Sequence, residues 1–217
     1  MIRFCPLLVA VTSTFVVQDP PVFPGFGDPL EVDRDCAIKL DGKTLVMAVP
    51  GTDHDYRPGP SGRKAPRVVR DMEGNFTAKV QVGGDVDTSS AKPGQGAGLF
   101  LGQDERNFVR LERLPRPGPE KGAIFFEYWQ DNQPKSGGNG VVEVSLKGDI
   151  SWLRLTRRMD KLKAEVSADG KDWVEAKTLT IRLSSRLNLG VIATNTSGKP
   201  FEARFTGFEF KGIPLYP

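Results

Sequence analysis

"GAGLFLGQDERNFVRLERL", residues 96–114, consists of two apolar runs on either side of a polar turn. In the second run Val109 and Leu111 alternate with the charged residues Arg110 and Glu112. Side chains along a strand point to opposite faces in turn, so this alternation predicts a core-facing row and an opposite row that carries charges. The stretch therefore predicts a β-hairpin, and its charged row raises the question of what those side chains face.

The same period-two pattern recurs along most of the chain, and no stretch of useful length has a helical period. Turn signals such as "DGK", "EGN" and "MDK" separate the segments. Strands are predicted at residues 36–40, 44–49, 67–72, 76–82, 97–103, 107–114, 123–130, 141–146, 152–158, 161–168, 174–180, 187–194 and 201–210. Short strands with turns about every 8–12 residues are typical of a sandwich or barrel. We predict an all-β, two-sheet antiparallel β-sandwich over residues 36–217.

Two further strands extend the mixed row of the opening hairpin. In residues 123–130, Ile124 and Phe126 are assigned to the core. In residues 152–158, Leu153 and Leu155 are assigned to the core in the same way. The opposite rows should then share one water-accessible sheet face, which we expect to carry Arg110, Glu112, Glu127, Trp129, Trp152 and Arg154.

Composition limits the classes of function that fit the chain. The sequence has 217 residues with 30 basic and 27 acidic side chains, a formal net charge of +3. This balance is too even to indicate nucleic-acid binding by itself, and no nucleic-acid motif is present. The 24 glycines and 17 prolines follow no period, which excludes a collagen-like chain and suits many turns.

The amino-terminal segment predicts export. Residues 1–17 place Arg3 before an apolar run that is too short to span a bilayer, so we interpret them as a signal peptide; a buried first strand is the alternative. Residues 18–35, rich in proline, glycine and aspartate, are interpreted as a lead-in. After cleavage Cys36 would be the one cysteine left, and we expect a secreted, periplasmic or envelope protein without a membrane span.

Three stretches together resemble one family of concanavalin A-like proteins. "GAGLFLGQDERNFVRLER" is similar to its "AGLLL…DE.NYVRLE" hairpin, and "SWLRLTRRMDKLKAEVSADGKDWVEA" to its later strands. "VPGTDHDYRPGPSGRKAPRVVRDMEGNFTAKVQV" resembles the "VPGT.HD…APR…GDFT" stretch of exported bacterial members. The family is the poorly characterised regulation-of-enolase-type family, and the resemblance covers residues 36–211. It implies a jelly-roll sandwich related to lectins and glycoside hydrolases, and it implies no established activity.

The mixed face has two interpretations. It is either a solvated sheet surface with cross-strand ion pairs, or a shallow groove in which Trp129 stacks on a sugar ring while charged side chains bind its hydroxyl groups. The leading hypothesis is an exported, non-catalytic module that binds a polysaccharide or glycan through Trp129, Glu127, Arg110, Glu112 and Arg154, with His54 and Asp55 as further candidates from the nearby loop.

Enzymatic alternatives rest on few residues. His54 is the single histidine, so a Ser-His-Asp enzyme would have to use it; a loop histidine that fixes a turn is the other interpretation. Glu112 and Glu127 lie on neighbouring predicted strands and are the acid–base candidates for a glycan hydrolase. The string "EVDRD", residues 31–35, lacks the strand context of a glycosidase motif. A structural or envelope protein with a protein partner is the third hypothesis, and the oligomeric state stays open.

Metal and anion sites are further alternatives. Asp53 with Asp55, and Asp85 with Asp87, offer oxygen ligands for a structural calcium ion, although they equally suit soluble loops. No cofactor is expected. The segment at residues 57–70 is rich in arginine, and it is either a solvated basic loop or a contact surface for an anionic polysaccharide.

Overall fold

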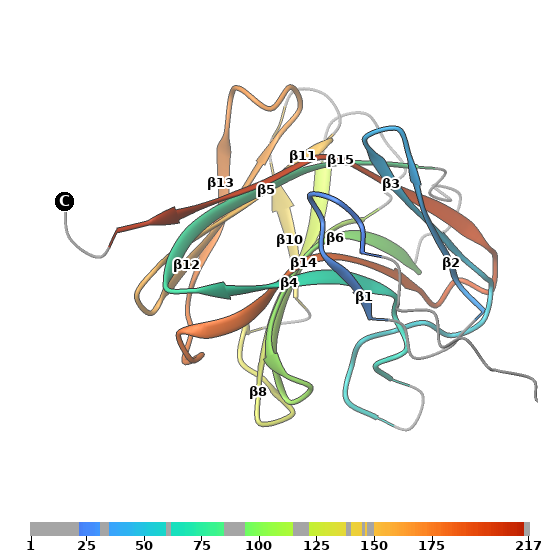
Figure 1. The fold of residues 1–217 in the computed structure, drawn as a ribbon. Helices are drawn as coiled ribbons and strands as arrows, with labels where there is room; N and C mark the ends of the chain where they lie inside the picture. The colour runs from blue at the N-terminus through green and yellow to red at the C-terminus, as the bar shows by residue number, and fades with distance from the viewer. Residues whose placement is uncertain are drawn as a thin grey trace, which may run out of the picture.

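The computed structural model describes residues 22–30, 35–59, 62–84, 94–114, 122–137, 140–144, 146 and 150–214. The described residues form fifteen strands and no helix (Figure 1). The strands are β1 (Asp28–Leu30), β2 (Ala37–Asp41), β3 (Thr44–Val49), β4 (Arg67–Glu73), β5 (Asn75–Gly84), β6 (Gln95–Asp104), β7 (Asn107–Arg113), β8 (Gly122–Gln130), β9 (Gln133–Pro134), β10 (Val141–Val144), β11 (Trp152–Arg158), β12 (Lys161–Ser167), β13 (Val174–Thr180), β14 (Arg186–Asn195) and β15 (Phe201–Ile213).

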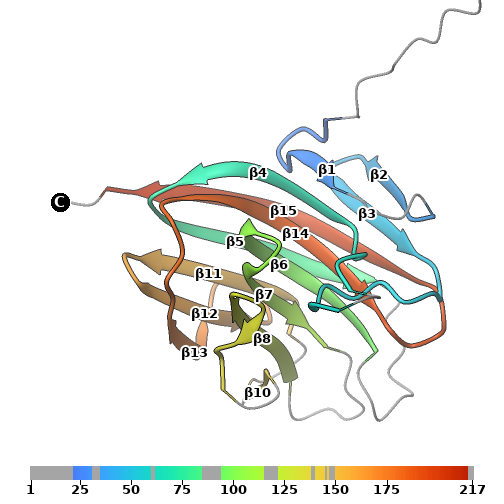
Figure 2. The ribbon, with the colours of Figure 1, turned by 90° about the horizontal axis from the view of Figure 1, so that it is seen from below.

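The strands form two antiparallel sheets packed face to face (Figure 2). The eight-stranded sheet has the order β1-β4-β14-β6-β7-β8-β10, with β9 paired to β8. The seven-stranded sheet has the order β13-β12-β11-β5-β15-β3-β2. The predicted all-β sandwich is therefore confirmed.

Among the described residues there is no helix with the length and apolarity of a membrane span.

The lead-in is part of the sandwich. β1 was not predicted; it pairs with β4, with Pro29 opposite Val68. Just before it, Phe23 and Phe26 are buried in the core. The alternation pattern does not predict β1, because that signal needs four or more alternating residues and β1 has three, in a stretch rich in proline and glycine. The proposed signal peptide, residues 1–17, lies outside the described residues, as do Glu31, Asp85 and Asp87.

The core lies between the two sheets where the alternation places it. Val109 and Leu111 of β7 and Leu153 and Leu155 of β11 have no exposed surface. Ile124 and Phe126 of β8 are equally buried in this core. All six assignments to the inward rows are therefore confirmed.

The outer face of the eight-stranded sheet is not open to water over β6, β7 and β8. A segment that we call the covering loop, residues 50–59 and 62–66, packs against it through Tyr56 and Ala65. Its Tyr56 packs edge-on against Phe100 of β6 and Phe108 of β7, with ring centroids 5.0 and 4.8 Å apart. Tyr56 also lies under the guanidinium of Arg67, 4.0 Å from the ring centroid. The expectation of a water-accessible face is wrong here, because aromatic side chains in the outer row form a second apolar cluster with the loop.

The outer row of β11 belongs to a different surface. Trp152 and Arg154 lie on the seven-stranded sheet, whereas Arg110 and Trp129 lie on the eight-stranded sheet. The prediction that all four share one face is therefore wrong. Alternation tells which side of a strand a residue occupies, and it does not tell which of the two sheets the strand joins.

We predict that Tyr56→Ala lowers the free energy of unfolding by about 3–5 kcal/mol, the usual cost of truncating a buried aromatic ring. The substitution removes both edge-on contacts and the ring beneath Arg67. Urea unfolding of the purified protein measures the change. Tyr56→Phe keeps the ring and should cost less than about 1 kcal/mol; equal losses in the two variants would contradict a role for the ring.

Candidate functional site

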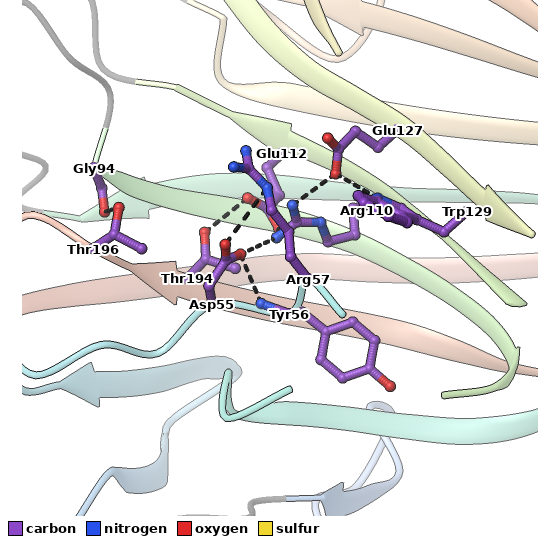
Figure 3. Close-up of polar contacts among 10 residues, drawn as sticks. All are labelled: Asp55, Tyr56, Arg57, Gly94, Arg110, Glu112, Glu127, Trp129, Thr194 and Thr196. Atoms are coloured by element: carbon purple, nitrogen blue, oxygen red, sulfur yellow. Dashed lines mark hydrogen bonds and ion pairs between the residues drawn. The ribbon is translucent and has the colours of Figure 1, made fainter. Parts of the chain in front are cut away.

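The guanidinium of Arg110 is buried among three carboxylates (Figure 3). Its Nη1 donates to Asp55 Oδ1 at 2.9 Å, and its Nη2 donates to Glu127 Oε2 at 2.8 Å. Glu112 Oε1 lies 3.5 Å from Nη1. Arg110 and Glu112 are 1% and 2% exposed, so these charges interact away from solvent.

Strand register brings the cluster together. Arg110 of β7 stands directly opposite Glu127 of β8, and Glu112 follows Arg110 on the same face. Thr194 of β14 donates a hydrogen bond of 2.8 Å to Glu112 Oε2. Gly96 of β6 leaves the room for that carboxylate, because a Cβ at this position would collide with Glu112 Oε2. Three neighbouring strands therefore fix the carboxylate of Glu112.

The covering loop supplies the third carboxylate. Asp55 Oδ1 also accepts the backbone N–H of Tyr56 at 2.7 Å, and Asp55 Oδ2 lies 3.5 Å from Arg57 Nε. The side chain of Arg57 is half exposed and its guanidinium lies 5.3 Å from the ring centroid of Phe125. Asp55 thus links the loop backbone to the sheet through Arg110.

Burial and charge act in opposite directions on these groups. Burial raises the pKa of Glu112 above its ordinary 4.5, and the nearby charge of Arg110 and the hydrogen bond from Thr194 offset this only in part. Burial alone would lower the pKa of Arg110, but the three carboxylates raise it above its ordinary value. Arg110 therefore stays a cation, while burial favours the protonated form of Glu112.

Two buried polar atoms of the cluster have no hydrogen-bond partner among the described residues, Glu112 Oε1 and Arg110 Nε. A buried polar atom left without a hydrogen bond costs about 1–3 kcal/mol. One is an acceptor and the other a donor. A hydroxyl group, which both donates and accepts, has the chemistry to satisfy the two together.

A cavity of about 290 Å³ opens beside the cluster. Its lining combines charged, hydroxyl and apolar side chains: Asp55, Arg57, Gln95, Arg110, Glu112, Leu114, Phe125, Val141, Thr194 and Thr196, with Gly94. Its volume lies at the lower end of the range of about 300–1,000 Å³ that is usual for ligand pockets. Mixed polar lining of this kind suits a small polar ligand or one end of a longer one.

Sequence reasoning identified Asp55, Arg110, Glu112 and Glu127 as site residues and missed Arg57, Phe125 and Thr194. Phe125 of β8 shares the outer row with Glu127 and lines the cavity, and the guanidinium of Arg110 lies 4.9 Å from its ring centroid. The position of Phe125 two residues before Glu127 was the available signal. Arg57 was noted only as part of the arginine-rich segment at residues 57–70, and Thr194 gave no signal, because threonine is common in strands.

Trp129 is on the predicted face but is not part of the cavity lining. Its ring stacks on Phe108 at 6.1 Å with the planes 14° apart, and its Nε1 donates to Glu127 Oε2 at 2.9 Å. The half-buried indole thus holds Glu127 in place beside Arg110.

Arg154 is separate from the other predicted site residues. It lies on the outer face of the seven-stranded sheet, where it forms a bidentate pair with Glu165 at 2.8 and 2.9 Å. Its guanidinium lies 4.0 Å from the ring centroid of Trp173. Its inclusion with Arg110 and Glu112 is therefore corrected, for the reason given for Trp152.

His54 is buried and hydrogen-bonded at the start of the covering loop. Nδ1 donates to the Thr52 carbonyl at 2.9 Å, and Nε2 lies 2.9 Å from Asp35 Oδ1. Its backbone exchanges hydrogen bonds with Asn195 of β14. His54 does not line the cavity. Of the two aspartates proposed for calcium, Asp53 is exposed and Asp55 binds Arg110.

The arginines of residues 57–70 are dispersed over different surroundings. Arg63 bonds to the Glu105 carbonyl and to Asn132, and Arg67 is buried beside Tyr56 and Phe100. Arg70 stacks on Phe210 of the opposite sheet. These side chains do not form the single basic patch that an anionic polysaccharide would need.

Comparison with solved structures shows the fold class. A functionally unknown protein from Saccharomyces cerevisiae superposes with a TM-score of 0.64 at 15% identity, covering 88% of this chain and 98% of that one. The GH43 protein BlXynB from Bacillus licheniformis gives 0.58 at 16% identity, with 78% of this chain matching 33% of that one. A legume lectin-like domain from Entamoeba histolytica gives 0.55 at 12% identity, covering 82% and 88%.

The fold is therefore a two-sheet antiparallel sandwich of the lectin-like jelly-roll type. The likeness to BlXynB concerns a third of that protein, so the activity of the whole enzyme does not transfer with it. No family model and no curated protein matches the sequence.

We predict that Arg110→Met destabilises the protein by about 3–5 kcal/mol, because it leaves the buried carboxylates of Glu112 and Glu127 and the partly buried carboxylate of Asp55 without their cation. Urea unfolding at neutral pH measures the loss. Arg106→Met is the matched control, since Arg106 is exposed and lies 3.9 Å from Asp131, and it should cost less than about 1 kcal/mol. A small loss for Arg110→Met would contradict the central role of this guanidinium.

The pH dependence of stability tests the state of Glu112. A carboxyl group with a raised pKa favours folding below its ordinary value of 4.5, and this contribution is lost as the pH rises through the folded-state pKa. Glutamine does not titrate. The stability of the wild type relative to Glu112→Gln should therefore fall as the pH rises from about 4 to 8. Unfolding curves across this range measure the difference; a difference that is constant with pH would contradict the raised pKa.

Proposed function

We propose that this protein is an exported, non-catalytic module that binds carbohydrate in the cavity beside Arg110. The observation that supports the proposal most directly is the buried, unpartnered acceptor and donor, Glu112 Oε1 and Arg110 Nε, on side chains that line a polar cavity. Sugars present dense hydroxyl groups, which both donate and accept hydrogen bonds. The lectin-like fold is compatible with this function and does not establish it.

The charges of the site favour a neutral sugar. Arg110 already forms ion pairs with three carboxylates, and Arg57 forms an ion pair with Asp55. With all groups ionised, three carboxylates and two guanidinium groups leave one negative charge. A uronic acid or a sulfated sugar would bring a further anion to a cluster with no spare cation. A neutral sugar meets no such repulsion.

The size of the cavity suits one sugar residue at the end of a chain. Phe125 and the apolar Leu114 and Val141 provide the wall against which the C–H face of a sugar ring packs. Trp129 lies on the same face of β8, four residues and about 13 Å further along the strand. A longer oligosaccharide leaving the cavity in that direction would contact the exposed part of the indole, in keeping with the role predicted from the sequence.

Glycan hydrolysis is the second candidate, and the raised pKa of Glu112 is the observation that favours it. Burial raises the pKa of Glu112, and a carboxyl group with a raised pKa is better suited to act as a general acid than an ordinary one. The partner carboxylates, Asp55 and Glu127, are both bound to Arg110 at 2.9 and 2.8 Å, which lowers their reactivity as base or nucleophile. Binding without turnover is therefore the better supported function.

Calorimetric titration with neutral and anionic oligosaccharides of matched length tests the proposal. We expect a neutral oligosaccharide to bind, and Arg57→Ala, at a half-exposed side chain on the rim, to weaken binding at least tenfold, about 1.4 kcal/mol. Arg154→Ala on the opposite sheet is the control and should leave the affinity unchanged. Trp129→Ala should weaken only the longer oligosaccharides.

Three results would overturn the proposal in different ways. Loss of binding with Arg154→Ala would move the site to the other sheet. Release of reducing ends by the wild type that Glu112→Gln abolishes would make the protein a hydrolase. No binding by any neutral oligosaccharide, together with self-association or capture of a protein partner, would favour a structural role.

A further inference from the structure

Asp35, Cys36 and His54 lie together although 18 residues separate Cys36 from His54 in the sequence. A carboxylate oxygen, the thiol sulfur and an imidazole nitrogen from these residues all lie within 4.8 Å of one another. His54 Nε2 is 2.9 Å from Asp35 Oδ1, and Cys36 Sγ is 3.8 Å from the same oxygen. The group lies at the opposite side of the covering loop from the Arg110 cluster, and none of its members lines the cavity described above.

These spacings are close to the edges of a tetrahedral zinc site. Zinc bond lengths of about 2.0–2.3 Å at tetrahedral angles place a nitrogen and an oxygen ligand about 3.4 Å apart, and a sulfur and an oxygen ligand about 3.6 Å apart. The His54–Asp35 and Cys36–Asp35 distances, 2.9 and 3.8 Å, differ from these values by roughly half an ångström or less, and the Cys36–His54 pair lies within 4.8 Å. A cation would therefore need only a small separation of His54 from Asp35.

The imidazole is oriented as a metal ligand usually is. A carbonyl oxygen only accepts, so His54 Nδ1 carries the hydrogen that it donates to Thr52 O at 2.9 Å. Metal-binding histidines almost always make this hydrogen bond with the other ring nitrogen, which fixes the ring and presents the remaining nitrogen to the ion. Here that nitrogen is Nε2, which points at Asp35. Full burial of His54 holds the ring in this orientation.

The surroundings allow a three-ligand site with one open position. The side chain of Asp35 is 46% exposed and Cys36 is half-buried, so solvent reaches this side of the group. Three protein ligands with water in the fourth position are a common arrangement for zinc. Thiolate and imidazole ligands favour zinc over calcium, which takes oxygen ligands.

We propose that Asp35, Cys36 and His54 form a zinc-binding site that ties the start of β2 to the covering loop. Zinc would replace the thiol hydrogen of Cys36 and the hydrogen that His54 Nε2 shares with Asp35 Oδ1, and both protons would be released to solvent, while Nδ1 keeps its hydrogen bond to Thr52. The site is independent of the carbohydrate proposal, because its ligands and its test involve none of the cavity residues.

Metal titration of the purified full-length chain, stripped with a chelator, tests this site. We expect one Zn²⁺ per chain, and one Co²⁺ in its place with the visible bands of tetrahedral cobalt and a sulfur-to-cobalt charge-transfer band. Zinc at about a hundred times its Kd should raise the Tm by about 5–10 °C. Oligosaccharide binding is measured separately, so that failure of one proposal leaves the other standing.

Matched variants identify the ligands. Cys36→Ser should remove the charge-transfer band and weaken zinc binding by more than about a hundredfold. Asp35→Asn should weaken binding, and Asp53→Asn, at an exposed neighbour of His54, should not. Circular dichroism confirms that each variant folds. No stoichiometric zinc in the wild type, or unchanged binding in Cys36→Ser and Asp35→Asn, would overturn the proposal.

Discussion

The buried pairing of Arg110 with Asp55, Glu112 and Glu127 is the interaction on which the outer face of the eight-stranded sheet depends. A guanidinium and three carboxylates are removed from water only if each finds an opposite charge or a hydrogen bond. The sheet alone provides two of the carboxylates, and the covering loop provides the third. The bond between Arg110 and Asp55 therefore helps to hold the covering loop against the sheet, and the loop in turn helps to keep Arg110 buried.

Three consecutive residues of the covering loop make the connection. His54 is directed to Asp35 and Thr52, Asp55 to Arg110, and Tyr56 to the aromatic rings of the outer row. Successive residues of an extended segment point in different directions, so one short stretch fastens the loop to three separate parts of the sandwich. The candidate cavity and the candidate zinc site are consequently built from neighbouring residues of the same segment and occupy opposite sides of it.

The sequence was sufficient to predict the two-sheet fold and the two sides of each central strand. Val109 and Leu111 on one side and Arg110 and Glu112 on the other follow from alternation alone, because the side-chain period of a strand is two. Alternation carries no information about which sheet a strand joins, and Arg154 was misplaced for that reason. It also says nothing of a loop folded over a face, and so burial of Arg110 and the roles of Arg57 and Phe125 emerged only with the tertiary structure.

The hydrogen bonds and ion pairs that Arg110 makes with Asp55, Glu112 and Glu127 bear on the choice between ligand binding and catalysis. Acid–base chemistry on a glycosidic bond needs one carboxyl group that donates a proton and a second carboxylate free to accept one or to attack carbon. Glu112 satisfies the first requirement through burial, whereas Asp55 and Glu127 are each fixed to the guanidinium by a short hydrogen bond. Thr194 further fixes the carboxylate of Glu112. The carboxylates of the cluster are thus already held by hydrogen bonds or ion pairs, and one donor and one acceptor remain without a partner; this is the physical basis on which we propose binding of a hydroxyl group rather than transfer of its proton.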